Sequence, residues 1–213
     1  MIRLVAFDLD GTIGDTIAMC ISAMRESVSP HALRELSDED VVQTFGLNEE
    51  GMIRHMAGPN WEKALDDFYE AYERMHGLCP QPFDGMRELI MELKGHGIPV
   101  ALVTGKGAKS CEITLKRFGL DACFDRVETG APDRNRKAEA IREVLEHFDV
   151  QPGDAVYVGD ALSDITACRE ACVPCLSAAW AVSEAEAVRQ EALNPGMVLH
   201  SIRELREWLL PRL

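Results

Sequence analysis

The chain has 213 residues, a length that suits one domain of ordinary size with at most a smaller insert. Its 36 acidic residues outnumber its 22 basic residues, so the formal net charge is −14, which disfavours binding to nucleic acids or anionic membranes. No stretch approaches the ~20 apolar residues of a membrane span, and the amino terminus lacks the pattern of a signal peptide. We therefore expect a cytoplasmic protein without a nucleic-acid or membrane partner.

A helical segment is expected after the first predicted strand. That strand covers residues 3–9, and four helices follow it with no strand between them. Their expected starts are Ile17, Ser37, Asn48 and Asn60. The second of these helices is expected to end near Gly46. We therefore expect an inserted α-helical bundle over residues 16–80, forming a cap, and a core made of residues 1–15 and 81–213.

Strands and helices alternate in the rest of the chain. Apolar runs of strand length lie at 98–104, 124–127, 155–158, 173–176 and 197–199. Amphipathic patterns lie between them, and the last two helices open with the capping boxes Ser183-x-x-Glu186 and Ser201-x-x-Glu204. Buried strands that alternate with amphipathic helices form parallel sheets covered on both faces. The sequence thus predicts an α/β fold with a Rossmann-like parallel sheet core flanked by helices, which binds ligands at the carboxyl ends of its strands.

Polar side chains stand at the ends of three predicted strands. Asp8 and Asp10 end the first strand, Thr104 ends the second, and Asp160 follows the run at 155–158. Two carboxylates at the end of a buried strand repel each other, and a divalent cation would relieve that repulsion. Hard oxygen ligands of this kind suit Mg²⁺. A nucleophile beside a general acid or base would also account for the first pair.

The residues at these positions resemble the four motifs of the haloacid dehalogenase-like hydrolases, in the family's order. The motifs are Asp8-Leu9-Asp10-Gly11-Thr12, Leu102-Val103-Thr104-Gly105, Lys137 at a helix start, and Gly159-Asp160-Ala161-Leu162-Ser163-Asp164. One such motif alone is weak, whereas four in order, each at a predicted strand end or helix start, are specific. The helical insert after the first motif is similar to the cap of the phosphoglycolate phosphatase-like branch.

This resemblance implies an activity. The protein would be a Mg²⁺-dependent phosphatase that hydrolyses a small, phosphoglycolate-like phosphomonoester through an aspartyl-phosphate intermediate. Asp8 would be the nucleophile, and Asp10 would be the general acid and base. Thr104, Gly105 and Lys137 would bind the phosphoryl group of the substrate.

The resemblance also implies a metal site. A carboxylate oxygen of Asp8, the backbone carbonyl of Asp10 and the carboxylate of Asp160 would hold Mg²⁺. Asp164 would support these ligands from behind. The binding partner would be a small phosphorylated metabolite. The branch that cleaves carbon–halogen bonds lacks a carboxylate at the place of Asp10, so its presence favours phosphate ester chemistry.

The sequence leaves some alternatives open. One is a pyrophosphatase or nucleotidase of the same fold, and another is a catalytically silent phosphate-binding protein. The third motif lacks the proline that often follows its lysine, so Arg136 could replace Lys137 as the phosphate partner. Lys106 and Lys109, just after the second motif, could add positive charge over the phosphate or could be solvated. The oligomeric state is not indicated.

Cysteine usage favours reduced thiols. The chain has seven cysteines, and most of them lie in apolar-periodic segments, as expected for small core residues. Cys172 and Cys175 form a C-x-x-C, a spacing also found in redox and zinc sites. No second pair accompanies them, so the core interpretation is preferred.

Overall fold

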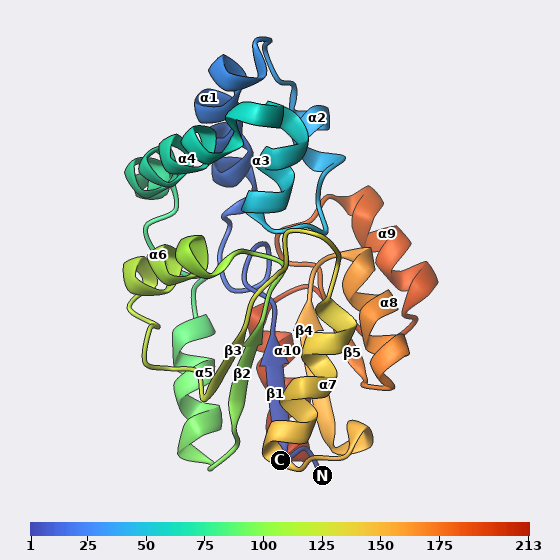
Figure 1. Cartoon of the computed structure of the whole chain (residues 1–213). Helices are drawn as coiled ribbons and strands as arrows, with labels where there is room; N and C mark the ends of the chain where they lie inside the picture. Colours follow the sequence, from blue (N-terminus) through green and yellow to red (C-terminus); the bar gives the residue numbers. More distant parts are fainter.

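The computed structural model describes all residues 1–213, and six parallel strands form its single sheet (Figure 1). In chain order they are β1 (Leu4–Phe7), β2 (Val100–Val103), β3 (Arg126–Glu128), β4 (Ala155–Gly159), β5 (Cys175–Ala178) and β6 (Val198–Leu199). Their order in the sheet is β3-β2-β1-β4-β5-β6, so the first strand lies in the centre. Phe7 pairs with Leu102 on one side and Val158 on the other. The predicted parallel α/β fold is confirmed, and Asp8 leaves the sheet at the middle of its carboxyl edge.

Six helices accompany the sheet. They are α5 (Met86–Gly95), α6 (Ala108–Phe118), α7 (Lys137–Phe148), α8 (Leu162–Ala171), α9 (Glu184–Leu193) and α10 (Ile202–Leu209). The predicted serine caps form, because the Ser183 and Ser201 hydroxyls each accept a hydrogen bond from the backbone N–H three residues on. No helix of the chain combines the length and the apolarity that crossing a membrane requires.

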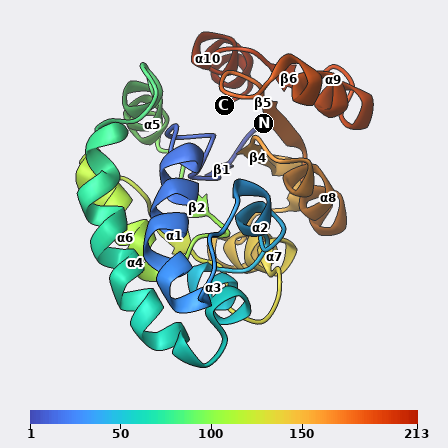
Figure 2. The same cartoon turned by 90° about the horizontal axis from the view of Figure 1, so that it is seen from above.

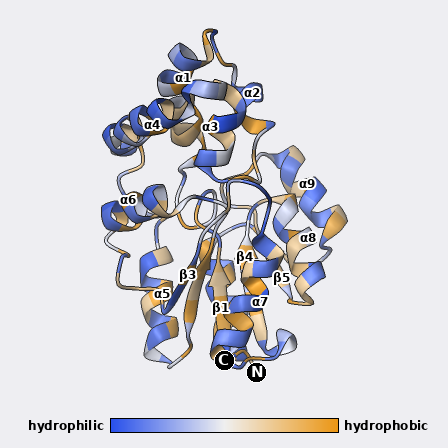
Figure 3. Ribbon diagram, in the orientation of Figure 1, coloured by the Kyte–Doolittle hydropathy of each residue, from blue (hydrophilic) through white to orange (hydrophobic).

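The strands bury side chains on both faces of the sheet. Val5 and Phe7 belong to one buried apolar cluster with residues of α5, α6 and α10, whereas Leu4 and Ala6 belong to a second cluster with residues of α7 and α8. This alternation follows from the two-residue period of a strand. Figure 3 shows the consequence, because the strands are strongly hydrophobic and the helices carry hydrophilic stretches. The sheet is therefore packed on both faces, and this packing fixes the positions of the side chains that follow its strands at the carboxyl edge.

Four helices with no strand between them lie beyond that carboxyl edge. They are α1 (Ile17–Ala32), α2 (Asp38–Val42), α3 (Glu49–Ala57) and α4 (Trp61–Met75). Seen from above, they lie over the side of β1 and β2 and leave the side of β6 uncovered (Figure 2). The prediction that the second helix ends near Gly46 was wrong, because α2 ends at Val42. The Thr44 hydroxyl bonds to the Val41 carbonyl, and the φ of Gly46 is 106°, a conformation outside any right-handed helix.

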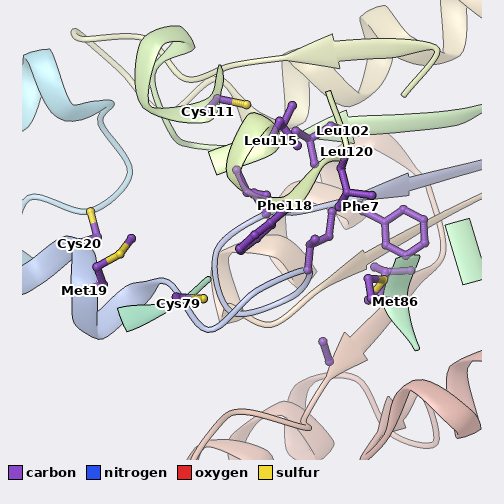
Figure 4. Close-up of a cluster of buried hydrophobic side chains, with 14 of the residues drawn as sticks. Phe7, Met19, Cys20, Cys79, Met86, Leu102, Cys111, Leu115, Phe118 and Leu120 are labelled. Atoms are coloured by element: carbon purple, nitrogen blue, oxygen red, sulfur yellow. The ribbon is translucent and has the colours of Figure 1, made fainter. Parts of the chain in front are cut away.

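The helical segment shares its apolar core with the sheet. Tyr72 of α4 is buried, and its hydroxyl lies 2.7 Å from the hydroxyl of Thr114 on α6. Figure 4 shows Met19 and Cys20 of α1 near Cys79, in the same cluster as Leu115 and Phe118 of α6. All seven cysteines are free thiols, and only Cys172 is exposed. Most cysteines therefore act as small apolar residues, as their sequence positions predicted.

Candidate active site

A cavity of about 160 Å³ lies between the carboxyl edge of the sheet and the helical segment. Residues of all four predicted motifs line it, namely Asp8, Asp10, Thr104, Gly105, Lys137 and Asp160. The helical side contributes Ile17, Cys20, Phe45, Leu47, Glu49 and Met52. Residues that are more than 150 positions apart in sequence thus meet because the parallel strands all end at one edge.

Asp8 is buried at the centre of this site. Its Oδ1 accepts a hydrogen bond of 2.8 Å from the Leu9 N–H, and its Oδ2 accepts one of 2.7 Å from Lys137 Nζ. Burial raises the pKa of Asp8 from 3.8 to about 6, although the Lys137 charge opposes the shift. Burial also acts to lower the pKa of Lys137, but the charges of Asp164 and Asp8 outweigh it, and the pKa is raised. Lys137 is therefore a fixed positive charge beside Asp8.

Three buried carboxylates converge next to Lys137. Oxygens of Asp8, Asp160 and Asp164 all lie within 4.8 Å of one another. The Asp164 carboxylate accepts hydrogen bonds from Lys137 Nζ at 2.5 Å and from the Ala161 N–H at 3.0 Å. The Asp160 carboxylate accepts a hydrogen bond of 3.0 Å from the Thr12 hydroxyl. Burial, followed by the Asp164 and Asp8 charges, raises the pKa of Asp160. One lysine cannot balance three carboxylates, so this cluster has the donor atoms and the excess charge that suit a divalent cation.

Gly11 makes room for this cluster. A Cβ atom at this position would lie 2.3 Å from Asp160 Oδ2, and the φ of Gly11 is +77°. Both observations require glycine, because any side chain would collide with the carboxylate and strain the backbone. The glycine of the first motif therefore lets the loop pass close to the acidic cluster.

The carboxylate of Asp10 points away from the acidic cluster. Its Oδ1 accepts a hydrogen bond from the Thr16 hydroxyl, and its Oδ2 lies 3.3 Å from Lys106 Nζ. The side chain is 24% exposed, on the side of the cavity that faces the helical segment. Asp8 and Asp10 thus present carboxylates to one cavity from different directions, which suits two different chemical tasks.

The loop after β2 brings Thr104 and Gly105 to the cavity wall. The Thr104 N–H donates to the Glu128 carbonyl at 3.0 Å, and its hydroxyl accepts from the Lys106 N–H at 3.2 Å. A Cβ atom on Gly130 would lie 2.0 Å from the Gly105 carbonyl oxygen, so the two loops are in direct contact. This tight packing holds the predicted phosphate-binding residues in place.

Arg136 and Lys137 point in different directions despite being adjacent. Arg136 donates to Glu128 Oε2 at 3.0 Å and also pairs with Glu143, away from the cavity. Lys137 instead enters the cavity and reaches Asp8. The open question of which residue faces the site therefore has a geometric answer, and it is Lys137.

Sequence reasoning missed one buried pair in this cavity. Lys106, expected above either to add positive charge over the phosphate or to be solvated, has a side chain that is 1% exposed. Its Nζ lies 3.2 Å from Oε1 of Glu49, a residue of α3 that was treated only as part of a helix start. An acidic residue in the first turn of a helix is ordinarily solvated, so nothing local marks Glu49. Lys109, by contrast, stacks on the ring of Tyr69 outside the cavity.

The family model for haloacid dehalogenase-like hydrolases matches residues 5–178 of the chain. The chain belongs to this family. Phosphoglycolate phosphatase 1 of Pseudomonas aeruginosa is 27% identical over 215 residues, which cover 95% of this chain and 78% of that protein. Pyrophosphatase PpaX of Bacillus mycoides is 26% identical over 206 residues, which cover 96% of this chain and 95% of that protein. A hydrolase structure from Pseudomonas syringae has a TM-score of 0.79 at 19% identity and covers 97% of each chain.

These similarities confirm the resemblance found in the four motifs. The fold, the order of the motifs and the relatives agree that the protein is a hydrolase of the haloacid dehalogenase-like phosphatase type, acting on phosphate esters. The relatives carry different substrate names, so similarity alone does not assign a substrate to this chain.

Proposed function

We propose that the protein is a Mg²⁺-dependent phosphatase that hydrolyses a small phosphomonoester through an aspartyl-phosphate on Asp8. The observation that carries this proposal is the position of Asp8. It lies at the centre of the carboxyl edge, buried, with Lys137 Nζ 2.7 Å away and Asp10 facing the same cavity. A phosphate-binding protein without catalysis would need the lysine but not two carboxylates directed at one small space.

In the first step, an ionised Asp8 oxygen attacks the substrate phosphorus and the bond from phosphorus to the leaving oxygen breaks. Asp10, in its protonated form, gives its proton to that oxygen, so the leaving group departs as a neutral alcohol. Lys137 balances negative charge on the phosphoryl oxygens, and the Thr104 hydroxyl donates a hydrogen bond to them. The products of this step are an aspartyl-phosphate and ionised Asp10.

In the second step, a water molecule attacks the phosphorus of the aspartyl-phosphate. Asp10 takes the proton from that water, the bond between Asp8 and phosphorus breaks, and inorganic phosphate leaves. Asp10 ends protonated and Asp8 ends ionised, which restores the starting state. The hydrogen bond from Thr16 and the nearby Lys106 hold the Asp10 carboxylate on the leaving-group side of the cavity.

The acidic cluster fits Mg²⁺. Asp8 and Asp160 would hold the ion with carboxylate oxygens, together with the backbone carbonyl of Asp10, and Asp164 would support them while it anchors Lys137. When bound, the ion would neutralise charge on the cluster and on the phosphoryl group. Burial, followed by the charges of Asp164 and Asp8, raises the pKa of Asp160, and a cation at this place would offset both effects.

Residues 16–80 act, in this proposal, as a cap over the cavity, with residues 1–15 and 81–213 as the core. The support is their position beyond the strand ends and their direct contacts with core loops (Figure 1). The Asn48 N–H donates to the Ala131 carbonyl at 2.9 Å, and the Gly107 N–H donates to Glu49 at 2.6 Å. A cap in this place would exclude bulk water from the reacting phosphoryl group.

The decisive experiment is turnover of an aryl phosphate. Wild-type protein is expected to release phosphate from p-nitrophenyl phosphate in millimolar Mg²⁺ and to lose this activity in EDTA. Asp8→Asn should lower kcat by roughly 10³-fold or more. Asp15→Asn is the matched control, because Asp15 lies on the same loop with an exposed side chain outside the cavity. Substantial turnover by Asp8→Asn would contradict the nucleophile.

The intermediate can be sought separately. Asp10→Asn should slow hydrolysis of the aspartyl-phosphate, so mass spectrometry after acid quenching should find one added phosphoryl group on the peptide that contains Asp8. Phosphoglycolate and inorganic pyrophosphate, which the names of the relatives suggest, belong in the first substrate panel with nucleoside monophosphates. A label on any other residue would contradict the mechanism.

A further inference from the structure

The leaving-group side of the cavity is chemically distinct from the phosphoryl side. Asp8, Thr104 and Lys137 fix the phosphoryl group at the strand ends, so the leaving group must extend toward Asp10 and the helical segment. The walls on that side are mainly apolar, and they are contributed by Ile17, Phe45, Leu47 and Met52. The whole cavity, phosphoryl side included, has a volume of about 160 Å³, close to that of a cavity that holds one benzene molecule. The space therefore suits a small leaving group.

Lys106 is the one cation on this side of the cavity, and its ammonium group is already paired with side chains of the protein. Its Nζ lies 3.3 Å from Asp10 Oδ2 and 3.2 Å from Glu49 Oε1. It also lies 4.6 Å from the centre of the Tyr72 ring. The ammonium group thus has two carboxylate partners and an aromatic face around it. It has little capacity left for an anionic part of the substrate.

Glu49 is firmly held against Lys106. Its side chain is 3% exposed, and it accepts hydrogen bonds from the Gly107 N–H at 2.6 Å, from the Ser110 hydroxyl and from Lys106. A substrate carboxylate could reach Lys106 only by displacing this one. Displacement would leave a buried carboxylate without its counter-charge, which is strongly unfavourable. Glu49 therefore keeps Lys106 occupied.

The neighbouring surface offers no substitute cation. Arg25, which lines the adjoining hollow beyond Asp160, donates to the Leu36 carbonyl at 2.6 Å and to Asp38 at 2.8 Å. The other polar side chains on the cavity wall include Asn135 and Ser163, which are neutral hydrogen-bonding groups. An uncharged alcohol would find partners here, whereas a carboxylate or phosphate would face the charge of Glu49 and would find no free cation.

We propose that the leaving group of the substrate is a small, uncharged and partly apolar alcohol, and that Glu49 excludes anionic leaving groups by occupying Lys106. This inference rests on the proposed phosphatase function and deepens it by naming the substrate class. It departs from the phosphoglycolate-like substrate that the family resemblance implies. Glu49 acts through Lys106, so its role is to set specificity rather than to take part in the chemistry.

The test compares two esters that differ only in charge. Phosphoglycolate has a carboxylate where its amide, glycolamide phosphate, has a neutral group of the same size. Wild-type protein in Mg²⁺ should show a kcat/KM for the amide at least about tenfold above that for phosphoglycolate. Glu49→Gln removes the charge; its carbonyl oxygen can still accept from the Gly107 N–H, and its amide NH₂ can donate to the Ser110 hydroxyl. The ratio of the two kcat/KM values should then move at least about tenfold toward phosphoglycolate, because Lys106 is released.

Glu50→Gln is the matched control. Glu50 is the next residue of α3 and pairs with Arg54 outside the cavity, so this variant should keep the wild-type ratio. Any general loss of rate in Glu49→Gln cancels in the ratio, and the wild-type comparison needs no variant at all. Preference of active wild-type protein for phosphoglycolate, or an unchanged ratio in folded Glu49→Gln, would overturn the inference. If wild-type protein instead cleaves none of the three substrates, phosphoglycolate, glycolamide phosphate and p-nitrophenyl phosphate, the proposed function is refuted.

Discussion

Replacing Asp8 by its neutral isostere should stabilise the fold when Mg²⁺ is absent, although it removes the proposed nucleophile. The pKa of Asp8 is raised from 3.8 to about 6, mainly by burial. A group with a raised pKa holds its proton more tightly in the folded state than in the unfolded state. Its favourable contribution to stability is therefore complete below about pH 4 and is lost as the pH rises through about 6.

The size of the effect follows from the two pKa values. The difference between 3.8 and about 6 corresponds to about 3 kcal/mol of unfolding free energy, at about 1.36 kcal/mol for each pKa unit. At pH 7.5 the ionised Asp8 imposes this cost, whereas an asparagine does not. The asparagine can still accept the hydrogen bond from the Leu9 N–H with its carbonyl oxygen. Asp8→Asn should thus be about 3 kcal/mol more stable than wild type at pH 7.5. At pH 4 its advantage in unfolding free energy should be about 1 kcal/mol or less.

Urea unfolding in EDTA at the two pH values measures this difference. In thermal unfolding at pH 7.5, the same free energy should raise the Tm by roughly 6–12 °C. Asp15→Asn, at an exposed carboxylate, should change the unfolding free energy by less than about 0.5 kcal/mol at either pH. If Asp8→Asn were less stable than wild type at pH 7.5, or if its advantage did not depend on pH, the electrostatic account of the site would be refuted.

Three further perturbations test the rest of the site. Mg²⁺ at one hundred times its Kd should stabilise folded wild-type protein by about 2.7 kcal/mol and so raise its Tm in scanning fluorimetry. The same Mg²⁺ concentration should raise the Tm of Asp160→Asn less. Asp10→Asn should lose far more activity on an alkyl phosphate than on p-nitrophenyl phosphate, whose leaving group needs no proton; equal losses in steady-state assays would contradict the acid role. Lys137→Met should abolish turnover and cost about 3–5 kcal/mol in urea unfolding, because Asp8 loses its counter-charge. Arg136→Met should keep most of the activity, since its partners lie outside the cavity, and a large loss would reopen the choice between the two cations.

The strands and the motif residues could be predicted because their information is local. An apolar run such as residues 4–7 is buried on both faces wherever a parallel sheet places it, so its composition alone indicates a central strand. Asp8, Thr104 and Asp160 follow such runs directly, and parallel strands bring their carboxyl ends to one edge. The convergence of these residues on one cavity was therefore implied by the topology before any distance was known.

The charges around the leaving group depended on the tertiary structure. Arg136 and Lys137 are adjacent and both positive, and only the orientation of α7 sends one to Glu128 and the other to Asp8. Glu49 and Lys106 are separated by 57 residues, on a helix of the inserted segment and on a loop after β2. Neither belongs to a pattern that predicts burial, because helix starts and loops are ordinarily solvated. Their pairing exists because α3 packs on that loop and excludes water from both charges, which is a property of the assembled chain and not of either sequence segment.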